Sequence, residues 1–349
     1  MLAAAASLAP LLGLTTMVTP AGAATLACGQ TITVNTTLDN DVGPCSNDGI
    51  IVGANNITFN LNGHRIFGTA TAGDGAGVLL SGRTGVTVRA GTVTDFDGGV
   101  VIEGGSGNTV QAMTVRDNIG NVSEQQFTDY GDGILVFNSG NNRVLQNSVV
   151  HNGPYSGITL LGNSDNNVVQ SNSVERNDLP DARPGFESPE GNNQSNNGIR
   201  LETINNSAAP DFNRVFANVV RLSGFDGIAV FPLAKDNVLD SNTVTANGVL
   251  GTLRPGDGIH VFGRAQRTIV RTNRVIGNAR HGIILDFFDP TMSPPGANRV
   301  ERNTSLQNGV APGRFPAFDL TDQNRFCDGN VWLANTFATK NDPGADCIH

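Results

Sequence analysis

The sequence predicts an all-β solenoid of about ten coils, in which short strands of successive coils stack in parallel. The first observation is a motif that recurs about every 22 to 24 residues along most of the chain. The second is that each copy contains three short runs in which apolar and polar residues alternate, as strands do. One such run cannot bury its apolar side alone, so the copies must stack to form a continuous core.

The composition agrees with many short strands and many corners. The chain has 43 glycines among 349 residues, whereas aromatic residues make up 6% and charged residues 15%. Glycine and asparagine tolerate left-handed backbone conformations, so we expect many turns and little helix. The net charge of −9 disfavours a nucleic-acid partner or an anionic membrane surface, because both need a basic protein surface.

Residues 1–23 resemble an export signal. They contain an apolar stretch and the small-residue site Ala21-Gly22-Ala23, although no lysine or arginine precedes the apolar stretch. The stretch is too short for a membrane span, and no other segment is long enough. We therefore expect a secreted, extracellular protein with no membrane span in its mature chain, residues 24–349.

Each copy of the repeat begins with a glycine, followed by an apolar residue, any residue and a second apolar residue. A turn follows, and then the pattern N-x-V-x-x-N-x-V-x-x-N. Positions one and three after the glycine should point inward, and positions two and four outward. A degenerate last copy begins near Ala317. The clear copies begin at Gly49, Gly77, Gly99, Gly133, Gly157, Gly198, Gly227, Gly258 and Gly282.

Asparagines recur at one place in successive copies. Stacked side-chain amides can form hydrogen bonds along such a column, so we expect a structural role for them. The column comprises Asn147, Asn172, Asn218, Asn242, Asn273 and Asn303.

Over about residues 30–337, the repeat resembles the right-handed parallel β-helix repeat family. This broad group includes NosD-like proteins, pectate lyases, polygalacturonases and alginate epimerases. The resemblance implies a single-stranded right-handed parallel β-helix, but not one activity, because many chemistries share this scaffold. The Asp-Asp and Arg-Ile-Lys motifs of the hydrolases are absent, and Asp289-Pro290 lacks the histidine of the epimerase motif.

The rod constrains the four cysteines, since a disulfide needs Cα atoms within about 7 Å. Two cysteines lie near each end of the rod, so we predict the pairs Cys28–Cys45 and Cys327–Cys347. Each pair would close one end, where unpaired strand edges are otherwise exposed. We expect an N-terminal cap at 24–48, coils at 49–337 and a C-terminal cap at 325–349.

Long insertions flank the first strand of the coils on both sides, and loops of this kind often carry function. We therefore predict a ligand groove along the outer side of this strand. The insertions fall at 119–132, 178–197, 204–212, 248–257, 287–297 and 309–316. Position two holds Leu135, Thr159, Arg200, Ala229, His260 and Ile284, and position four holds Phe137, Leu161, Glu202, Phe231, Phe262 and Asp286.

The candidate catalytic residues are His260, His281, Arg280, Asp257 and Asp286. The stacking of coils should place His281 about 5 Å from Asp257. In lyases and epimerases of uronic-acid polymers, a base removes the proton beside a carboxylate that a cation neutralises. A histidine could be the base here, and Arg280 or Arg200 the cation. The alternative for each histidine is a hydrogen-bonded surface residue.

The candidate substrate-binding residues are Arg200, Glu202, Phe231, Phe262, Tyr130 and Tyr155. Asp257, Asp286 and Asp289 could bind calcium, but no dense carboxylate cluster is evident, so we expect no cofactor. The predicted function is binding and processing of an extracellular polysaccharide, with anionic polymers among the candidates, by a monomer. The alternative is a non-catalytic cell-surface or structural β-helix, or a NosD-like accessory protein.

Overall fold

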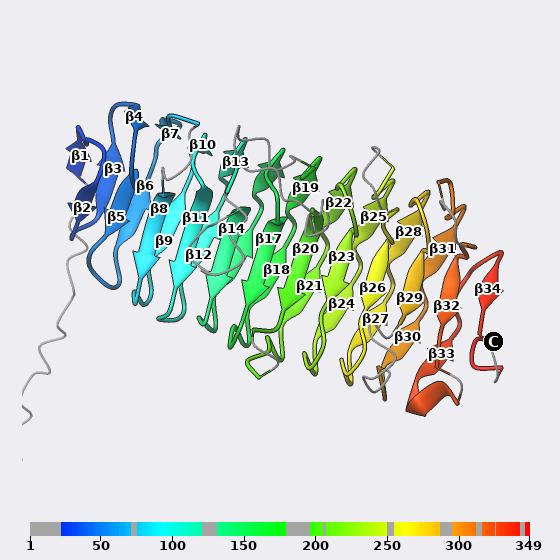
Figure 1. The fold of residues 1–349 in the computed structure, drawn as a ribbon. Helices are drawn as coiled ribbons and strands as arrows, with labels where there is room; N and C mark the ends of the chain where they lie inside the picture. The colour runs from blue at the N-terminus through cyan, green and yellow to red at the C-terminus, as the bar shows by residue number, and fades with distance from the viewer. Residues whose placement is uncertain are drawn as a thin grey trace, which may run out of the picture.

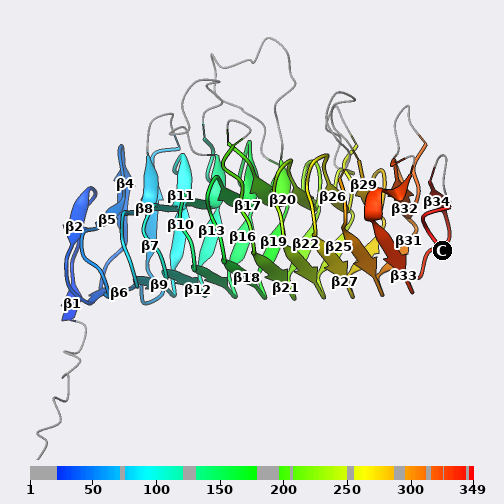
Figure 2. The same ribbon diagram turned by 90° about the horizontal axis from the view of Figure 1, so that it is seen from below.

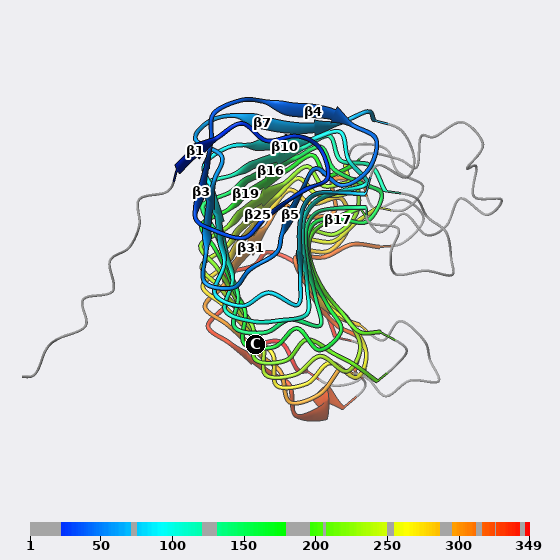
Figure 3. The ribbon, with the colours of Figure 1, turned by 90° about the vertical axis from the view of Figure 1, so that its left-hand side faces the viewer.

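The computed structural model describes residues 22–70, 75–120, 131–178, 196–204, 207–249, 255–286, 295–311, 316–324, 326–342 and 346–349. These residues form the predicted all-β right-handed parallel β-helix. The coils stack along a rod from β1 to β34 (Figures 1 and 2), and the view along the rod shows its three walls (Figure 3). The described residues contain no α-helix, and the one 3-10 turn is η1, Cys327–Gly329.

Three parallel sheets form the walls. Sheet A contains β1 Gly22–Ala24, β3 Thr36–Leu38, β6 Thr58–Asn60, β9 Thr87–Arg89, β12 Thr109–Gln111, β15 Arg143–Leu145, β18 Val168–Gln170, β21 Arg214–Phe216, β24 Val238–Asp240, β27 Ile269–Arg271, β30 Arg299–Glu301 and β33 Val331–Leu333. Sheet B contains β2 Gln30–Ile32, β5 Ile50–Val52, β8 Ala76–Ser81, β11 Gly98–Glu103, β14 Asp132–Phe137, β17 Ser156–Leu161, β20 Asn197–Glu202, β23 Ile228–Val230, β26 Ile259–Val261, β29 Ile283–Leu285, β32 Leu320–Asp322 and β34 Lys340–Asn341. Sheet C contains β4 Val42–Cys45, β7 Arg65–Gly68, β10 Thr92–Thr94, β13 Thr114–Arg116, β16 Ser148–Val150, β19 Ser173–Glu175, β22 Val219–Arg221, β25 Thr243–Thr245, β28 Arg274–Ile276 and β31 Thr304–Leu306.

The first strand of each predicted coil lies in sheet B. The ten predicted copies correspond to β5, β8, β11, β14, β17, β20, β23, β26, β29 and β32, and the sheet adds β2 and β34 at its edges. After its sheet B strand, each coil passes through sheet A and then sheet C. Every pairing between strands of neighbouring coils is parallel among the described residues, so equivalent positions of the repeat lie in columns.

The inward positions form one continuous core. Positions one and three of the first strand are fully buried in the copies that we compared, for example Ile259 and Val261 of β26. They pack with the central valines of sheets A and C, such as Val270 and Val275. This confirms the predicted alternation, because only one side of each short strand faces the interior.

The leading glycines are required by close packing. The φ of Gly258 lies outside the left-handed region, but an added Cβ would lie 2.3 Å from Val275 Cγ1 and 2.6 Å from the Gly282 carbonyl oxygen. Left-handed turn residues lie elsewhere, and one set of them lies directly before the predicted asparagine column. They include Ser241 and Thr272, with φ of 55° and 57°. The expectation that glycine and asparagine supply the left-handed corners is therefore wrong at these turns.

The predicted asparagine column is a buried ladder of hydrogen bonds. In each step, the backbone N–H and the side-chain Nδ2 of one asparagine both donate to Oδ1 of the next, as from Asn218 to Asn242 at 3.0 Å. The column runs through all six predicted residues and ends on Asn335. The ladder thus satisfies backbone groups that the tight turns would leave unpaired.

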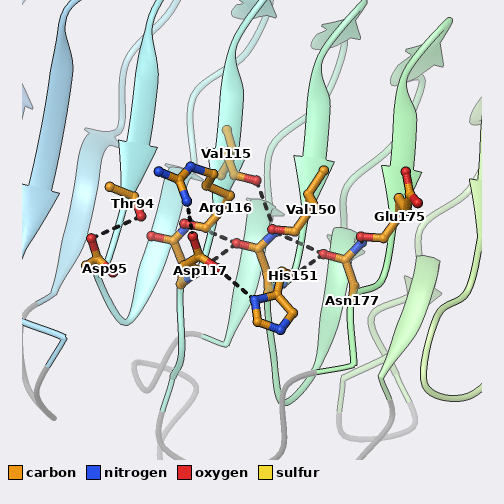
Figure 4. Close-up of polar contacts among 11 residues, drawn as sticks. Thr94, Asp95, Val115, Arg116, Asp117, Val150, His151, Glu175 and Asn177 are labelled. Carbon is orange, nitrogen blue, oxygen red and sulfur yellow. Dashed lines mark hydrogen bonds and ion pairs between the residues drawn. The ribbon is translucent and has the colours of Figure 1, made fainter. Parts of the chain in front are cut away.

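Two further ladders were not predicted. One contains Asn108, Asn142, Asn167, Asn213 and Asn237. The other contains Asn118, Asn152 and Asn177, has Ser223 in place of an asparagine in the next coil, and continues with Asn247, Asn278 and Asn308. Figure 4 shows the ladder that contains Asn177, beside the outer turn residues Asp117 and His151. His151 Nδ1 lies 2.7 Å from Asp117 Oδ1 in this turn column.

Both predicted disulfides are present. Cys28 pairs with Cys45, and Cys327 pairs with Cys347, with Cα–Cα distances of 5.4 and 5.5 Å. Residues 1–21 of the predicted export signal lie outside the described residues, and the boundary predicted after Ala23 falls inside β1, which pairs with β3. Within the described part of the chain, no helix has the length and apolar character to cross a membrane.

Candidate functional site

The register of sheet B brings the predicted site residues together on its outer side. Arg200 of β20 pairs with Ala229 of β23, which pairs with His260 of β26 and then with Ile284 of β29. The whole position-two column is nevertheless buried, and His260 is only 2% exposed. The outward face is therefore buried at this column. The residues directly before the leading glycines are buried as well, and partly exposed residues lie at position four and two residues before the glycine, as in Tyr155 and Arg280.

Three carboxylates surround the imidazole of His260. Its Nδ1 lies 3.3 Å from Asp226 Oδ2 and 3.2 Å from Asp257 Oδ2, while its Nε2 lies 3.6 Å from Asp286 Oδ2. Asp226 and Asp257 are fully buried, and Asp286 is partly exposed. In the sequence, Asp226 is marked only by its place directly before the leading Gly227, so its place beside His260 is a finding of the structure.

The two buried aspartates have opposite pKa shifts. Burial raises the pKa of Asp226 above its ordinary value, and the attraction of His260 offsets this only in part. Burial also acts to raise the pKa of Asp257, but the guanidinium of Arg280 outweighs it and holds that pKa well below its usual range. Asp257 is therefore an anion at neutral pH.

The three carboxylates favour a charged imidazole. Burial lowers the pKa of His260, but the attraction of Asp226, together with contacts to Asp257 and Asp286, raises it well above the ordinary value. His260 therefore carries a proton at neutral pH when no other cation is near it. A buried imidazolium does not suit the predicted role of base, which stays a prediction.

Arg280 holds Asp257 with two donors. Its Nε donates to Asp257 Oδ1 at 2.8 Å, and its Nη2 donates to Asp257 Oδ2. Burial lowers the pKa of Arg280, but Asp257 more than compensates and raises it. The side chain remains 21% exposed, so part of this guanidinium faces solvent.

His281 is a neutral imidazole with a fixed orientation. Burial lowers its pKa to about 4. Its Nδ1 accepts the Phe318 N–H at 3.2 Å and lies 2.8 Å from Thr321 Oγ1, so the proton of the neutral ring is on Nε2. Its own backbone N–H donates to Asp257 Oδ1 at 2.7 Å, which confirms the predicted proximity of His281 and Asp257.

A stack of aromatic rings and one guanidinium group extends from His260 of β26 to Arg200 of β20. The rings of His260 and Phe262 stack with centroids 3.6 Å apart, and those of Phe262 and Phe231 lie 4.7 Å apart. The Arg200 guanidinium lies 4.7 Å from the Phe231 centroid and 5.7 Å from that of Tyr155. Five predicted site residues therefore lie in one continuous stack.

Arg200 also donates a hydrogen bond to the partly exposed carboxylate of Glu202. The predicted binding residue Tyr130 and the predicted calcium ligand Asp289 lie outside the described residues. The catalytic and binding roles of the remaining site residues stay predictions, although the structure brings these residues together.

Asp132 is a further ionisable residue of this face that the sequence did not single out. It is buried at the start of β14 and accepts a hydrogen bond from Thr159 Oγ1 at 2.5 Å. The charge of Arg200 lowers the pKa of Asp132, and the charge of Glu202 raises it. Burial raises its pKa to about 7, because the Thr159 hydroxyl and Arg200 offset the loss of water only in part. The only sequence signal was its place before a leading glycine.

We expect Asp132→Asn to stabilise the protein at high pH and not at low pH. The folded state binds this proton more tightly than the unfolded chain, so wild-type stability falls as pH rises from about 4 to about 7. At pH 8 the variant should be more stable by on the order of 2–4 kcal/mol. Urea unfolding at pH 4, 6 and 8 measures this. The exposed Asp39→Asn is the control, and parallel pH curves for Asp132→Asn and wild type would contradict the raised pKa.

Two solved structures are similar to the chain over most of its length. The periplasmic alginate epimerase AlgG has a TM-score of 0.53 and 14% sequence identity, covering 89% of this chain and 77% of that one. An alginate lyase from Paenibacillus sp. str. FPU-7 has a TM-score of 0.51 and 11% identity, covering 90% and 91%. At these identities the likeness establishes the fold alone.

Sequence comparison identifies the family. No curated protein sequence is significantly similar to the chain. Residues 22–208, more than half of the chain, match the family described as right handed beta helix region. The strand order, the parallel register and this match agree, so the chain belongs to the right-handed beta helix family.

Proposed function

We propose that the protein binds an acidic extracellular polysaccharide on the outer side of sheet B and processes it by proton transfer beside a uronate carboxylate. The observation that carries this proposal is the stack of Arg200, Phe231 and Phe262, which combines a guanidinium with ring faces. Guanidinium groups pair with carboxylates, and an aromatic-lined face with few polar groups is a common composition for a ligand site.

The partly exposed residues of this face define where a polymer would lie. Tyr155, Glu202, Phe231, Asp286 and Arg280 are all partly exposed, and they span coils β17 to β29. Neighbouring coils repeat at about 4.8 Å, so this edge extends over about 20 Å. That length is sufficient for several sugar units of an extended chain.

Glu202 occupies the guanidinium of Arg200 in the free protein. A uronate carboxylate has the same chemistry and would take its place on Arg200, while Glu202 turns to solvent. Neutralising the substrate carboxylate makes the adjacent proton removable, because the carbanion that forms is otherwise too unstable. We therefore assign Arg200 the role of neutralising cation.

Tyr155 is our candidate for proton transfer. His260 is charged at neutral pH and His281 carries its proton on Nε2, so neither imidazole presents a free base to a polymer. Tyr155 is partly exposed and lies beside the Arg200 guanidinium. A phenol can serve as acid or base when a cation is near.

The similar structures and the cysteines support the same proposal. Proteins of this shape include an alginate epimerase and an alginate lyase, which act on a uronate polymer. Two disulfides fit an oxidising compartment, so we propose that the chain is secreted. The second candidate is a non-catalytic polysaccharide-binding protein, which the burial of both imidazoles favours.

Incubation with a panel of polyuronates tests the proposal. A lyase produces unsaturated ends that absorb ultraviolet light, and an epimerase exchanges the sugar proton for deuterium from solvent, which NMR detects. We expect one of these signals from wild type and its loss in Tyr155→Phe. Binding without either signal would leave the second candidate, and no binding to any polyuronate would overturn both.

A further inference from the structure

We propose that Asp226, Asp257 and His260 form a binding site for one divalent transition-metal ion of the zinc type. The site lies between the coils of β23 and β26. This inference does not rest on the proposed function, because it concerns residues that are buried away from any polymer.

The geometry of the three ligand atoms fits one ion. One candidate ligand atom from each residue lies within 4.8 Å of the others. His260 Nδ1 is 3.3 Å from Asp226 Oδ2 and 3.2 Å from Asp257 Oδ2. Ligands that share a tetrahedral ion at about 2.0–2.1 Å lie about 3.3–3.4 Å apart, so both separations match edges of such a site.

Two of the three ligand residues, His260 and Asp226, carry buried atoms without a hydrogen-bond partner. Both nitrogens of His260 and the Oδ2 of Asp226 are buried, and none of these three atoms has a partner with hydrogen-bond geometry. Buried polar atoms are nearly always satisfied, and a site for an ion is one of the recognised reasons for an exception. This second observation indicates a ligand at the point where the three side chains converge.

The rest of each carboxylate is already fixed. Asp226 Oδ1 accepts the Asp257 N–H at 2.7 Å, which leaves its Oδ2 toward His260. Asp257 Oδ1 accepts the His281 N–H and Arg280 Nε, and its Oδ2 accepts Arg280 Nη2 while retaining a lone pair for His260 or an ion. Such outer contacts orient ligands before a metal binds.

Asp286 completes the arrangement at the other nitrogen. Its Oδ2 lies 3.6 Å from His260 Nε2. A carboxylate at this position favours the tautomer with the proton on Nε2, which leaves the Nδ1 lone pair for an ion. In zinc sites, a carboxylate commonly contacts the nitrogen of the imidazole that does not bind the metal.

The charges also favour a divalent cation. Around a neutral His260 imidazole, three carboxylates face one guanidinium, that of Arg280. The cluster then has two excess negative charges in a buried place, where unbalanced charge is costly. A divalent ion cancels both, whereas a proton on His260 cancels one.

The ligand types select the class of metal. Imidazole nitrogen with carboxylate oxygen suits zinc, manganese or iron, whereas calcium prefers six to eight oxygen ligands. The three aspartates that the sequence offered as possible calcium ligands, Asp257, Asp286 and Asp289, therefore differ from this site, since His260 takes the central position. Because the ligands are buried and come from the neighbouring coils of β23 and β26, the ion would have a structural role and link these two coils.

Metal analysis of the untagged full-length chain tests this inference. After treatment with a chelator and dialysis against Zn²⁺ or Mn²⁺, wild type should retain about one ion per chain and melt at a higher temperature than the stripped form. Asp226→Asn and His260→Gln should lose this ion. Asp286→Asn should weaken binding by about 10–100-fold, because it acts only through His260. His151→Ala is the matched control and should retain the ion, since the His151–Asp117 pair lies in the outer turns of sheet C (Figure 4).

A measurement on wild type alone guards against variants that fail to fold. Co²⁺ added to the stripped chain should give the intense visible absorption of a tetrahedral site with a nitrogen ligand. A spectrum of the hydrated Co²⁺ ion, or uptake of Zn²⁺ by Asp226→Asn equal to that of wild type, would overturn the inference. Neither outcome depends on polysaccharide processing, so failure here and failure of the proposed function are distinguishable.

Discussion

Replacing Asn242 by alanine is expected to destabilise the protein by about 2–6 kcal/mol. The Asn242 side chain accepts two hydrogen bonds from Asn218 and donates to the Val215 carbonyl and to Asn273 Oδ1, all in the buried interior. Alanine leaves the Asn218 N–H and one N–H of the Asn218 side-chain amide without their acceptor. Each buried group that loses its partner costs about 1–3 kcal/mol, against a typical total stability of 5–15 kcal/mol.

Thermal and urea unfolding followed by circular dichroism measure this effect. Asn163→Ala is the matched control, because Asn163 is exposed in a turn of the same rod and its loss should change stability by no more than about 0.5 kcal/mol. Equal unfolding curves for Asn242→Ala and Asn163→Ala would mean that the ladder contributes nothing to stability. We expect instead that the ladder variant unfolds first or does not fold.

Arg200→Ala is expected to lower kcat/KM on a polyuronate by about 10²–10³-fold. The guanidinium is the cation that we assign to the substrate carboxylate, and no other cation contacts Phe231 among the described residues. Arg200→Lys should retain part of the activity, because it keeps the charge but loses the planar group that stacks on the ring. Progress curves with the polymer that responds best in the panel measure both.

Arg214→Ala is the matched control for Arg200→Ala. Arg214 lies 5.0 Å over the ring of Phe216, so it is also a guanidinium on an aromatic ring, but it belongs to sheet A. Equal losses of activity in the two variants would remove Arg200 from the site. If the protein binds a polymer without processing it, the same comparison applies to the dissociation constant.

The repeat made the fold predictable. Alternation identified the strands, and the constant spacing of Gly258 and its equivalents aligned the coils, so that the columns of sheet B followed directly. The disulfides followed because the rod separates Cys28 from Cys327. The two additional ladders were not predicted, although their asparagines also recur in most coils.

The site was predicted less completely than the fold. The sequence placed Arg200, Phe231 and His260 on one face, because register follows from the repeat. It did not reveal that His260 is buried, since burial of an outward face depends on what covers it. Asp226 and Asp132 remained corner residues in the sequence, because the conformation that turns a carboxylate toward a neighbouring coil is not encoded in spacing.

By itself, the sequence determined the parallel β-helix, its inward and outward positions and the two disulfide pairs. Each of these depends on the period of the repeat, and a period is a property of the chain alone. Only the tertiary structure decided that His260 lies among Asp226, Asp257 and Asp286, and that His281 is neutral. Charge states and ligand geometry depend on distances of a few ångströms and on the loss of water, which arise only when the coils are packed together.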